Sequence, residues 1–221
     1  MKKVLTLVLI VCITVAFAGT AIAAPTVPGA VYSDQQAAGT NKPVTQIQQE
    51  LQQAGVVDVK PTDWFAGSVT VILQSGLLKP AANGDFEPEK TVSGGEGVAV
   101  FAKVLGIAAK NDSTEEAMDK MKEAGLVDTH VSIDGDMSRL EFAKLLARAL
   151  GVEPKAVTSP ADYAFSDIDS ASPEDRGIMQ ALYDLGIFKG YVENGVRTFK
   201  PGNTMTRAEL AILVDRILGA H

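Results

Sequence analysis

The feature that most constrains this chain is a helix-start signature that precedes three apolar runs. A hydroxyl residue is followed three positions later by a glutamate, at Ser93–Glu96, Ser138–Glu141 and Thr206–Glu209. In such a capping box the hydroxyl accepts a hydrogen bond from the backbone N–H of the glutamate. The glutamate carboxylate in turn accepts one from the backbone N–H of the hydroxyl residue. The three pairs therefore predict the starts of three helices.

The three runs share further positions when they are aligned on their glutamates. Apolar residues follow four and nine positions later, and a cation follows seven positions later, as Lys103, Arg148 and Arg216. A carboxylate in the first turn and a cation in the last turn both suit the helix dipole. Each of these helices, and each helix predicted before it, ends at a glycine, the usual C-terminal stop: Gly76, Gly106, Gly125, Gly151, Gly186 and Gly219. The pattern indicates three related helix–loop–helix units.

The repeat divides the chain. We predict a signal peptide (1–23), a linker or disordered arm (24–44), unit 1 with a preceding short helix (45–107), a short unit 2 (108–152), a connector (153–162) and unit 3 (163–221). A single helix pair cannot bury its apolar faces, so the units should pack together. We expect an all-α fold in which the three units form a pseudo-threefold bundle, with short strands near Phe86 and Phe199.

The N-terminus has the three parts of a secretory signal. Lys2 and Lys3 precede an apolar run over 4–17, and a small-residue cleavage site follows at 21–23. The run is short for a membrane span. It contains the chain's one cysteine, Cys12, so the mature chain would have no disulfide. Removing both lysines takes the formal net charge from −7 to −9, and no basic cluster indicates a nucleic-acid partner.

Catalysis is not expected. The mature chain has two histidines, His130 and His221, and no motif of a known nucleophile or metalloprotease. The number of acidic residues alone does not decide whether two of them form a carboxylate pair of the glycosidase type. We therefore predict a protein that is not an enzyme and that has no cofactor.

One segment has the length of a calcium-binding EF-hand loop. In 130–141, Asp134, Gly135, Asp136 and Glu141 fall at positions 5, 6, 7 and 12 of such a loop. The first position, which should be aspartate, is His130. A turn followed by a capped helix explains the segment better, and we predict no metal site.

Several motifs resemble one known family. Unit 3 contains Phe-Ser-Asp-Ile at 165–168, Leu-Gly-Ile-Phe-Lys-Gly-Tyr at 185–191, Phe-Lys-Pro at 199–201 and Met-Thr-Arg-Ala-Glu at 205–209. These motifs resemble a surface-layer homology (SLH) repeat. Unit 1 keeps Phe-Glu-Pro at 86–88, and unit 2 keeps Ser-Arg-Leu-Glu at 138–141. The chain is therefore similar to proteins with three tandem SLH repeats behind a signal peptide.

The resemblance implies an exported anchor of the cell wall or surface layer. Such domains bind a secondary cell-wall polysaccharide attached to peptidoglycan, often pyruvylated, in grooves between repeats, with the motif arginine as a main contact. Arg207 and Arg139 match that arginine, whereas we place Gly95 at the same position in unit 1. A guanidinium can pair bidentately with a ketal carboxylate, so we expect one or two working grooves.

Some assignments stay open. Trp64 occupies an aromatic position of the family and could stack on a sugar ring, or it could be a core residue between helices. We expect the three box glutamates to act as caps rather than ligand contacts. The competing function is a degenerate SLH-repeat module of the envelope, structural or interacting, that does not bind glycan. Neither reading implies a nucleic acid or, after signal cleavage, a membrane span, and assembly with a surface layer is possible under both.

Overall fold

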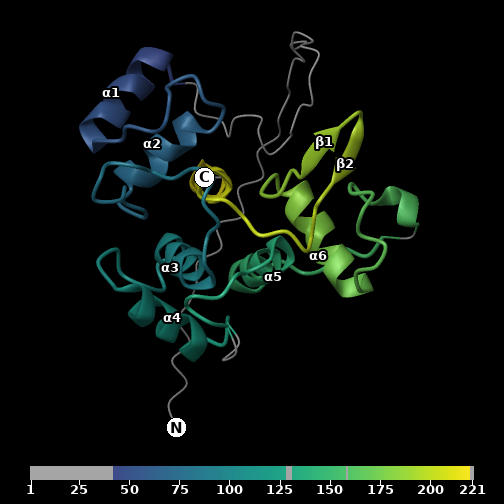
Figure 1. Ribbon diagram of the computed structural model, residues 1–221. Helices are drawn as coiled ribbons and strands as arrows, with labels where there is room; N and C mark the ends of the chain where they lie inside the picture. The colour runs from purple at the N-terminus through teal and green to yellow at the C-terminus, as the bar shows by residue number, and fades with distance from the viewer. Residues whose placement is uncertain (1–41, 128–130, 158, 220–221) are drawn as a thin grey trace.

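The computed structural model describes residues 42–127, 131–157 and 159–219 (Figure 1). The α-helices are α1 (Val44–Ala54), α2 (Ala66–Gln74), α3 (Gly94–Val104), α4 (Thr114–Glu123), α5 (Arg139–Leu150), α6 (Pro173–Asp184) and α7 (Arg207–Gly219), and a 3-10 turn spans Pro160–Asp162. Strands β1 (Tyr191–Glu193) and β2 (Val196–Thr198) form an antiparallel hairpin with Tyr191 opposite Thr198. The all-α prediction is confirmed. The predicted signal peptide lies outside the described residues.

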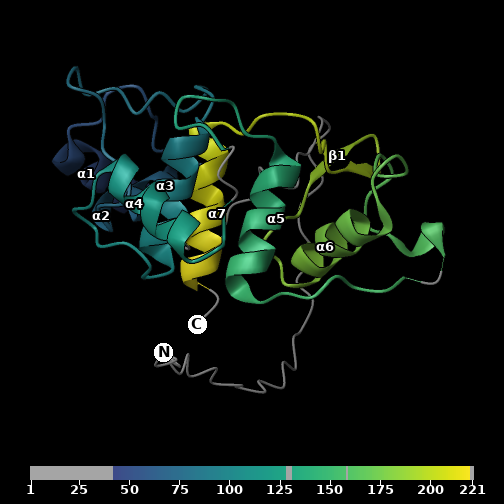
Figure 2. The same cartoon turned by 90° about the horizontal axis from the view of Figure 1, so that it is seen from below.

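Helix packing joins different units. The first helix of each predicted unit packs on the second helix of the unit before it: α4 on α3, α6 on α5, and α2 on α7. The last of these contacts joins unit 1 to unit 3 and closes the ring (Figures 1 and 2). None of the helices in the described part of the chain is both long and apolar enough to span a bilayer.

The loops that precede α3, α5 and α7 pair in a cyclic order. The backbone bridges are Thr91–Thr206, Ser93–Asp136 and Ser138–Thr204. In each bridge the N-cap residue of one unit lies opposite the residue two positions before the N-cap of another unit. The same geometry therefore occurs three times around one centre, and the expected pseudo-threefold bundle is confirmed.

Two local expectations differ from the structure. The short strand expected near Phe199 is present as β2, which ends at Thr198, but the segment around Phe86 forms no strand among the described residues. Gly219 is the last residue within α7 instead of following it, whereas the glycines after the other six described α-helices are left-handed, with φ between 66° and 74°. Their left-handed backbone explains why glycine was the reliable stop signal in the sequence.

A partly buried ion pair holds α1 against α2. Lys42 Nζ lies 2.6 Å from Glu50 Oε2 and donates to Thr70 Oγ1 at 3.1 Å. Burial raises the pKa of Glu50, but hydrogen bonds from Lys42 and neighbouring polar groups outweigh it and lower the pKa from 4.5 to about 2. The ionised form is therefore favoured in the folded protein, and this stabilisation should be lost as the pH falls from about 4.5 to about 2.

Glu50→Gln should accordingly lower the free energy of unfolding by roughly 2–3 kcal/mol at pH 6, and the deficit should vanish near pH 2. Urea denaturation across this range measures the difference. Exposed Glu89, changed to Gln, is the control and should follow the wild type at every pH. A Glu50→Gln deficit that does not change with pH would contradict the assignment.

Candidate functional site

Three equivalent pockets lie along the second helices of the units. Each is lined by the box glutamate of a unit, the apolar residue four positions later and the cation seven positions later. Groove 1, along α3, has a volume of about 320 Å³; groove 2, along α5, about 210 Å³; and groove 3, along α7, about 10 Å³. The three grooves differ in the arginine, if any, that enters them from the unit before, where unit 3 counts as the unit before unit 1.

Arg207, the first residue of α7, enters groove 1. Its Nε donates to the carbonyl oxygen of Phe86 at 2.7 Å, its Nη2 donates to that of Lys79 at 3.1 Å, and its Nη1 pairs with Glu96. The guanidinium carbon lies 4.9 Å from the centroid of the Phe86 ring. The residue is 6% exposed, so the motif arginine of unit 3 is a buried clasp on unit 1.

Arg139, the first residue of α5, makes the equivalent contacts in groove 3. Its Nε donates to the carbonyl oxygen of Phe199 at 2.9 Å, and its Nη1 lies 3.7 Å from Glu209 Oε2. It is 1% exposed, with its guanidinium carbon 4.6 Å from the centroid of the Tyr191 ring. The two predicted ligand contacts therefore lie in separate grooves.

Two aspartates hold the loops that present these carbonyl groups. Asp58 accepts from the backbone N–H groups of Phe86 and Glu87, and Asp167 accepts from those of Phe199 and Lys200, all at 2.7–2.8 Å. Glu87 and Lys200 both have positive φ, 58° and 57°. The aspartates stabilise a strained turn that aims the phenylalanine carbonyl at the arginine. Sequence reasoning missed this role, although both aspartates lie in the segments that resemble the family.

Groove 2 receives no arginine, and the residue at that position is Gly94, not Gly95. Gly94 N–H donates to the Gly135 carbonyl at 2.7 Å, just as Arg139 N–H donates to that of Asn203 at 2.8 Å and Arg207 N–H to that of Lys90 at 3.0 Å. The sequence alignment was therefore displaced by one residue. A Cβ atom on Gly94 would lie 2.9 Å from the Ser132 carbonyl oxygen, so the short loop of unit 2 excludes a side chain there.

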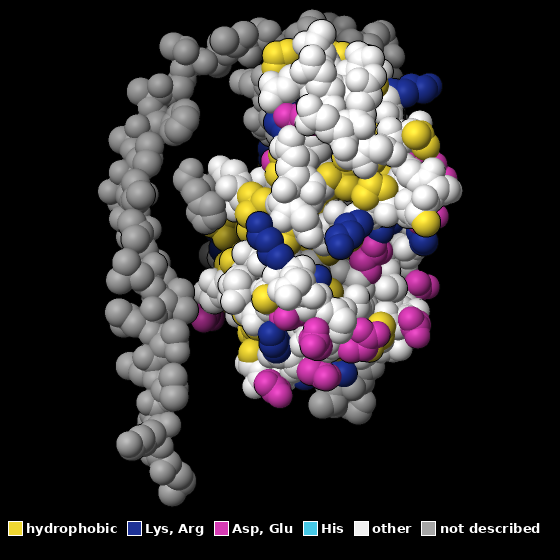
Figure 3. Space-filling view, turned by 90° about the vertical axis from the view of Figure 1, so that its left-hand side faces the viewer, with side chains coloured by type: hydrophobic (Ala, Val, Ile, Leu, Met, Phe, Trp, Pro, Cys, Tyr) yellow, Lys and Arg dark blue, Asp and Glu magenta, His cyan; other side chains and the backbone are white. Residues whose placement is uncertain are grey.

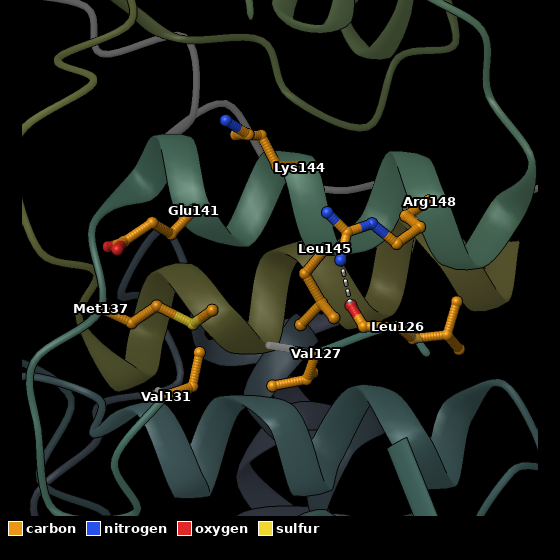
Figure 4. A pocket seen from close by; sticks show the side chains of 8 residues that line it. All are labelled: Leu126, Val127, Val131, Met137, Glu141, Lys144, Leu145 and Arg148. Carbon is orange, nitrogen blue, oxygen red and sulfur yellow. Dashed lines mark hydrogen bonds between the residues drawn. The ribbon is translucent and has the colours of Figure 1, made fainter. Parts of the chain in front are cut away.

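The lining of groove 2 is mainly apolar. Its walls are Leu126, Val127, Val131, Met137 and Leu145, with Glu141, Lys144 and Arg148 at the edges (Figure 4). Figure 4 shows Lys144 pointing away from the apolar side chains. Its Nζ lies 3.0 Å from Asp175 Oδ1, and Arg148 Nη1 donates to the Leu126 carbonyl at 3.2 Å. These cations are thus already engaged.

The box glutamates do not all have the same role. Glu141 and Glu209 complete reciprocal boxes, accepting from the N–H groups of Ser138 at 2.7 Å and Thr206 at 3.0 Å. Ser93 Oγ accepts from Glu96 N–H at 3.2 Å, but no reciprocal bond is formed in α3. The carboxylate of Glu96 pairs with Arg207 instead, which corrects the expectation of a cap alone.

Trp64 lies away from the three grooves, whereas the EF-hand-like segment contributes Val131, Met137 and Glu141 to the lining of groove 2. Trp64 is half-buried against the core, edge-on to Phe65 with ring centroids 5.2 Å apart, and it lines none of the three grooves. In the described part of the chain, no three acidic, histidine or cysteine side chains are grouped closely enough to hold a metal ion. His130 and His221 fall outside the described residues.

Groove 1 has an excess of positive charge. Four cations line it, Lys79, Lys103, Lys110 and Arg207, against two carboxylates, Glu96 and Asp112. Glu96 pairs with Arg207, and the hydrogen bond from Lys120 lowers the pKa of Asp112. On the side of the molecule that Figure 3 shows, Lys and Arg side chains lie across the middle and Asp and Glu side chains gather below them. Sequence reasoning missed Lys79 and Lys110, which follow the helix-ending glycines Gly76 and Gly106 by three and four positions.

Two segments with this geometry match a known family model. They match the S-layer homology domain. The matched residues are 57–96 and 164–211, within units 1 and 3. Both contain the Phe-x-Pro loop whose carbonyl accepts from a motif arginine, and unit 2, whose sequence has no Phe-x-Pro, lies between them.

Curated relatives agree with this match. The chain is 24% identical over 165 residues to the surface-layer 125 kDa protein of Lysinibacillus sphaericus, covering 68% of this chain and 14% of that protein. It is 25% identical over 175 residues to the S-layer protein sap of Bacillus anthracis (72% and 20%), and 29% identical over 98 residues to the middle cell wall protein of Brevibacillus brevis (43% and 9%). The chain thus spans about a fifth or less of these relatives. The matches indicate a location at the cell surface or in the cell wall, and none of these descriptions is that of an enzyme.

Proposed function

We propose that this protein anchors non-covalently at the cell surface by binding a secondary cell-wall polysaccharide in groove 1. The ligand would carry carboxylates, as a pyruvylated polysaccharide does, and would be attached to peptidoglycan. Association with a surface layer, which the names of the relatives suggest, belongs to the same proposal.

The observation that carries the proposal is the charge balance of groove 1. Both of its carboxylates are paired, whereas no hydrogen bond or ion pair among the described residues engages the ammonium groups of Lys79, Lys103 and Lys110. Ser113 and Thr114, at the start of α4, also line the groove and add the positive potential of a helix N-terminus. A local cationic groove can hold an anionic glycan although the whole chain is acidic.

Removing the three ammonium groups should weaken polymer binding. Lys79→Ala, Lys103→Ala and Lys110→Ala combined should reduce binding about 10- to 100-fold, because an exposed ion pair contributes up to about 1 kcal/mol. Co-sedimentation with purified sacculi that carry the polymer measures the affinity. The melting temperature should stay nearly constant, because these lysines do not hold the fold together.

The control removes the same charge elsewhere. Lys60, Lys90 and Lys122 lie outside the groove linings, and changing them together to alanine should leave binding within about twofold at physiological salt. Equal losses in the two triple variants would show a non-specific charge effect and overturn the assignment of groove 1. Unchanged binding to sacculi stripped of the polymer would exclude the polysaccharide as ligand. No binding to either preparation would favour the degenerate module.

A further inference from the structure

Groove 3 contains the parts of groove 1 and yet is closed. It has a motif arginine, Arg139, a box glutamate, Glu209, and a last-turn cation, Arg216. Its volume is about 10 Å³, compared with about 320 Å³ in groove 1. The second helices differ, because Ile212 and Arg216 stand where groove 1 has Ala99 and Lys103. A neighbouring segment of unit 3 also contacts both Arg139 and Glu209.

That segment is the β1–β2 hairpin, through Tyr191. The Tyr191 ring packs on the guanidinium of Arg139, and its hydroxyl donates to Glu209 Oε1. Lys200 Nζ lies 4.5 Å from the centroid of the same ring. Tyr191 is 8% exposed, so its buried ring and hydroxyl cover the Arg139 guanidinium and the Glu209 carboxylate.

The corresponding loop of unit 1 offers a comparison within the same chain. Between Lys79 and Phe86 it reads Pro-Ala-Ala-Asn-Gly-Asp, with no aromatic residue. Its turn is closed by backbone hydrogen bonds between Ala81 and Asp85 at 2.8 Å and between Gly84 and Ala81 at 2.9 Å. Groove 1 stays open beside a motif arginine that, like Arg139, donates to the carbonyl of a phenylalanine in a Phe-x-Pro loop.

We propose that Tyr191 plugs groove 3 and so restricts the chain to one polymer site, in groove 1. Tyr191 is then a specificity-determining residue that acts through Arg139, and removing its ring would open a second cationic groove. The part of this proposal that concerns polymer sites rests on the function proposed above, whereas the closure of groove 3 by Tyr191 can be tested without any glycan.

The test measures access to Arg139 with phenylglyoxal, a dicarbonyl that modifies guanidinium groups, followed by mass spectrometry of the labelled full chain. In the wild type Arg139 should be protected, and in Tyr191→Ala it should be labelled about tenfold faster or more, because protection follows local opening. Tyr191→Phe keeps the ring and should keep the protection. Arg207 is the internal reference, since it is buried in another groove and its labelling should not change.

Equal labelling of Arg139 in the wild type and Tyr191→Ala would overturn the proposal, as would a parallel rise at Arg207, which would indicate general loosening. If Tyr191→Ala does not fold, Tyr191→Val keeps a strand-forming residue and gives the same readout. Calorimetry with solubilised polymer should then count one site per wild-type chain and two per variant. Absence of wild-type binding would refute the proposed function alone, and the labelling would still decide the role of Tyr191.

Discussion

Replacing Arg139 with alanine should lower the free energy of unfolding by about 3–5 kcal/mol, because it removes one partner from a buried, hydrogen-bonded charge cluster. The Phe199 carbonyl would lose its donor at 2.9 Å. Glu209 would lose its nearby cation, and the Tyr191, Phe188 and Phe199 rings would lose the guanidinium that packs among them. Urea denaturation followed by circular dichroism measures the change.

Arg148→Ala is the matched control on the same helix. Its guanidinium is exposed and donates to the Leu126 carbonyl at 3.2 Å, so its loss should cost less than about 1 kcal/mol. If the two variants lost similar amounts of stability, removing any arginine from α5 would be destabilising, and the clasp role of Arg139 would be refuted.

The clasp role changes how arginine variants should be used to find the ligand. Arg207 is also buried and bonded to two backbone carbonyls, so Arg207→Ala should both destabilise the bundle and alter groove 1. Loss of polymer binding in that variant would not separate a direct contact from a displaced loop. The three lysines of groove 1 avoid this difficulty because they are not needed for packing.

Features that depend on residues close together in the sequence could be predicted from it. A hydroxyl and a glutamate three residues apart can only meet at the first turn of a helix, so the boxes at Ser138 and Thr206 located the starts of α5 and α7. Apolar periodicity then identified the buried faces. The all-α class and the ring of three units followed, because each helix pair needed a partner.

Contacts between units could not be predicted in the same way. Arg207 meets Glu96 across 111 residues and the Phe86 carbonyl across 121, and no local spacing encodes either distance. The same holds for Glu96, whose spacing predicted a cap but whose carboxylate is taken by an arginine from another unit. The close approach of Gly94 to Ser132 and the packing of Tyr191 on Arg139 likewise join different units.

Gly97→Ala should be strongly destabilising although it introduces a better helix former. A Cβ at this position would lie 2.2 Å and 2.4 Å from Cε1 and Cζ of Phe142, a fully buried residue whose ring packs edge-on against Phe101 at 5.8 Å. Alanine gains about 1 kcal/mol in helix propensity, whereas displacing a packed ring costs typically 1–3 kcal/mol and sometimes more. We expect a net loss of about 2 kcal/mol, together with weaker polymer binding, because α3 also carries Glu96 and Lys103 of groove 1.

A double-mutant cycle with Phe142→Leu separates this collision from a backbone effect. Leucine leaves room for the new methyl group, so Gly97→Ala should cost at least about 1 kcal/mol less in the Phe142→Leu background. Gly202→Ala, where a Cβ would meet nothing within 4 Å, should stay within about 0.5 kcal/mol of the wild type. An additive cycle would show that α3 and α5 do not depend on close approach at Gly97. Favourable coupling would show that the close approach of Gly97 and Phe142 brings α3 and α5 together. The same contact would then hold α3 in place beside groove 1.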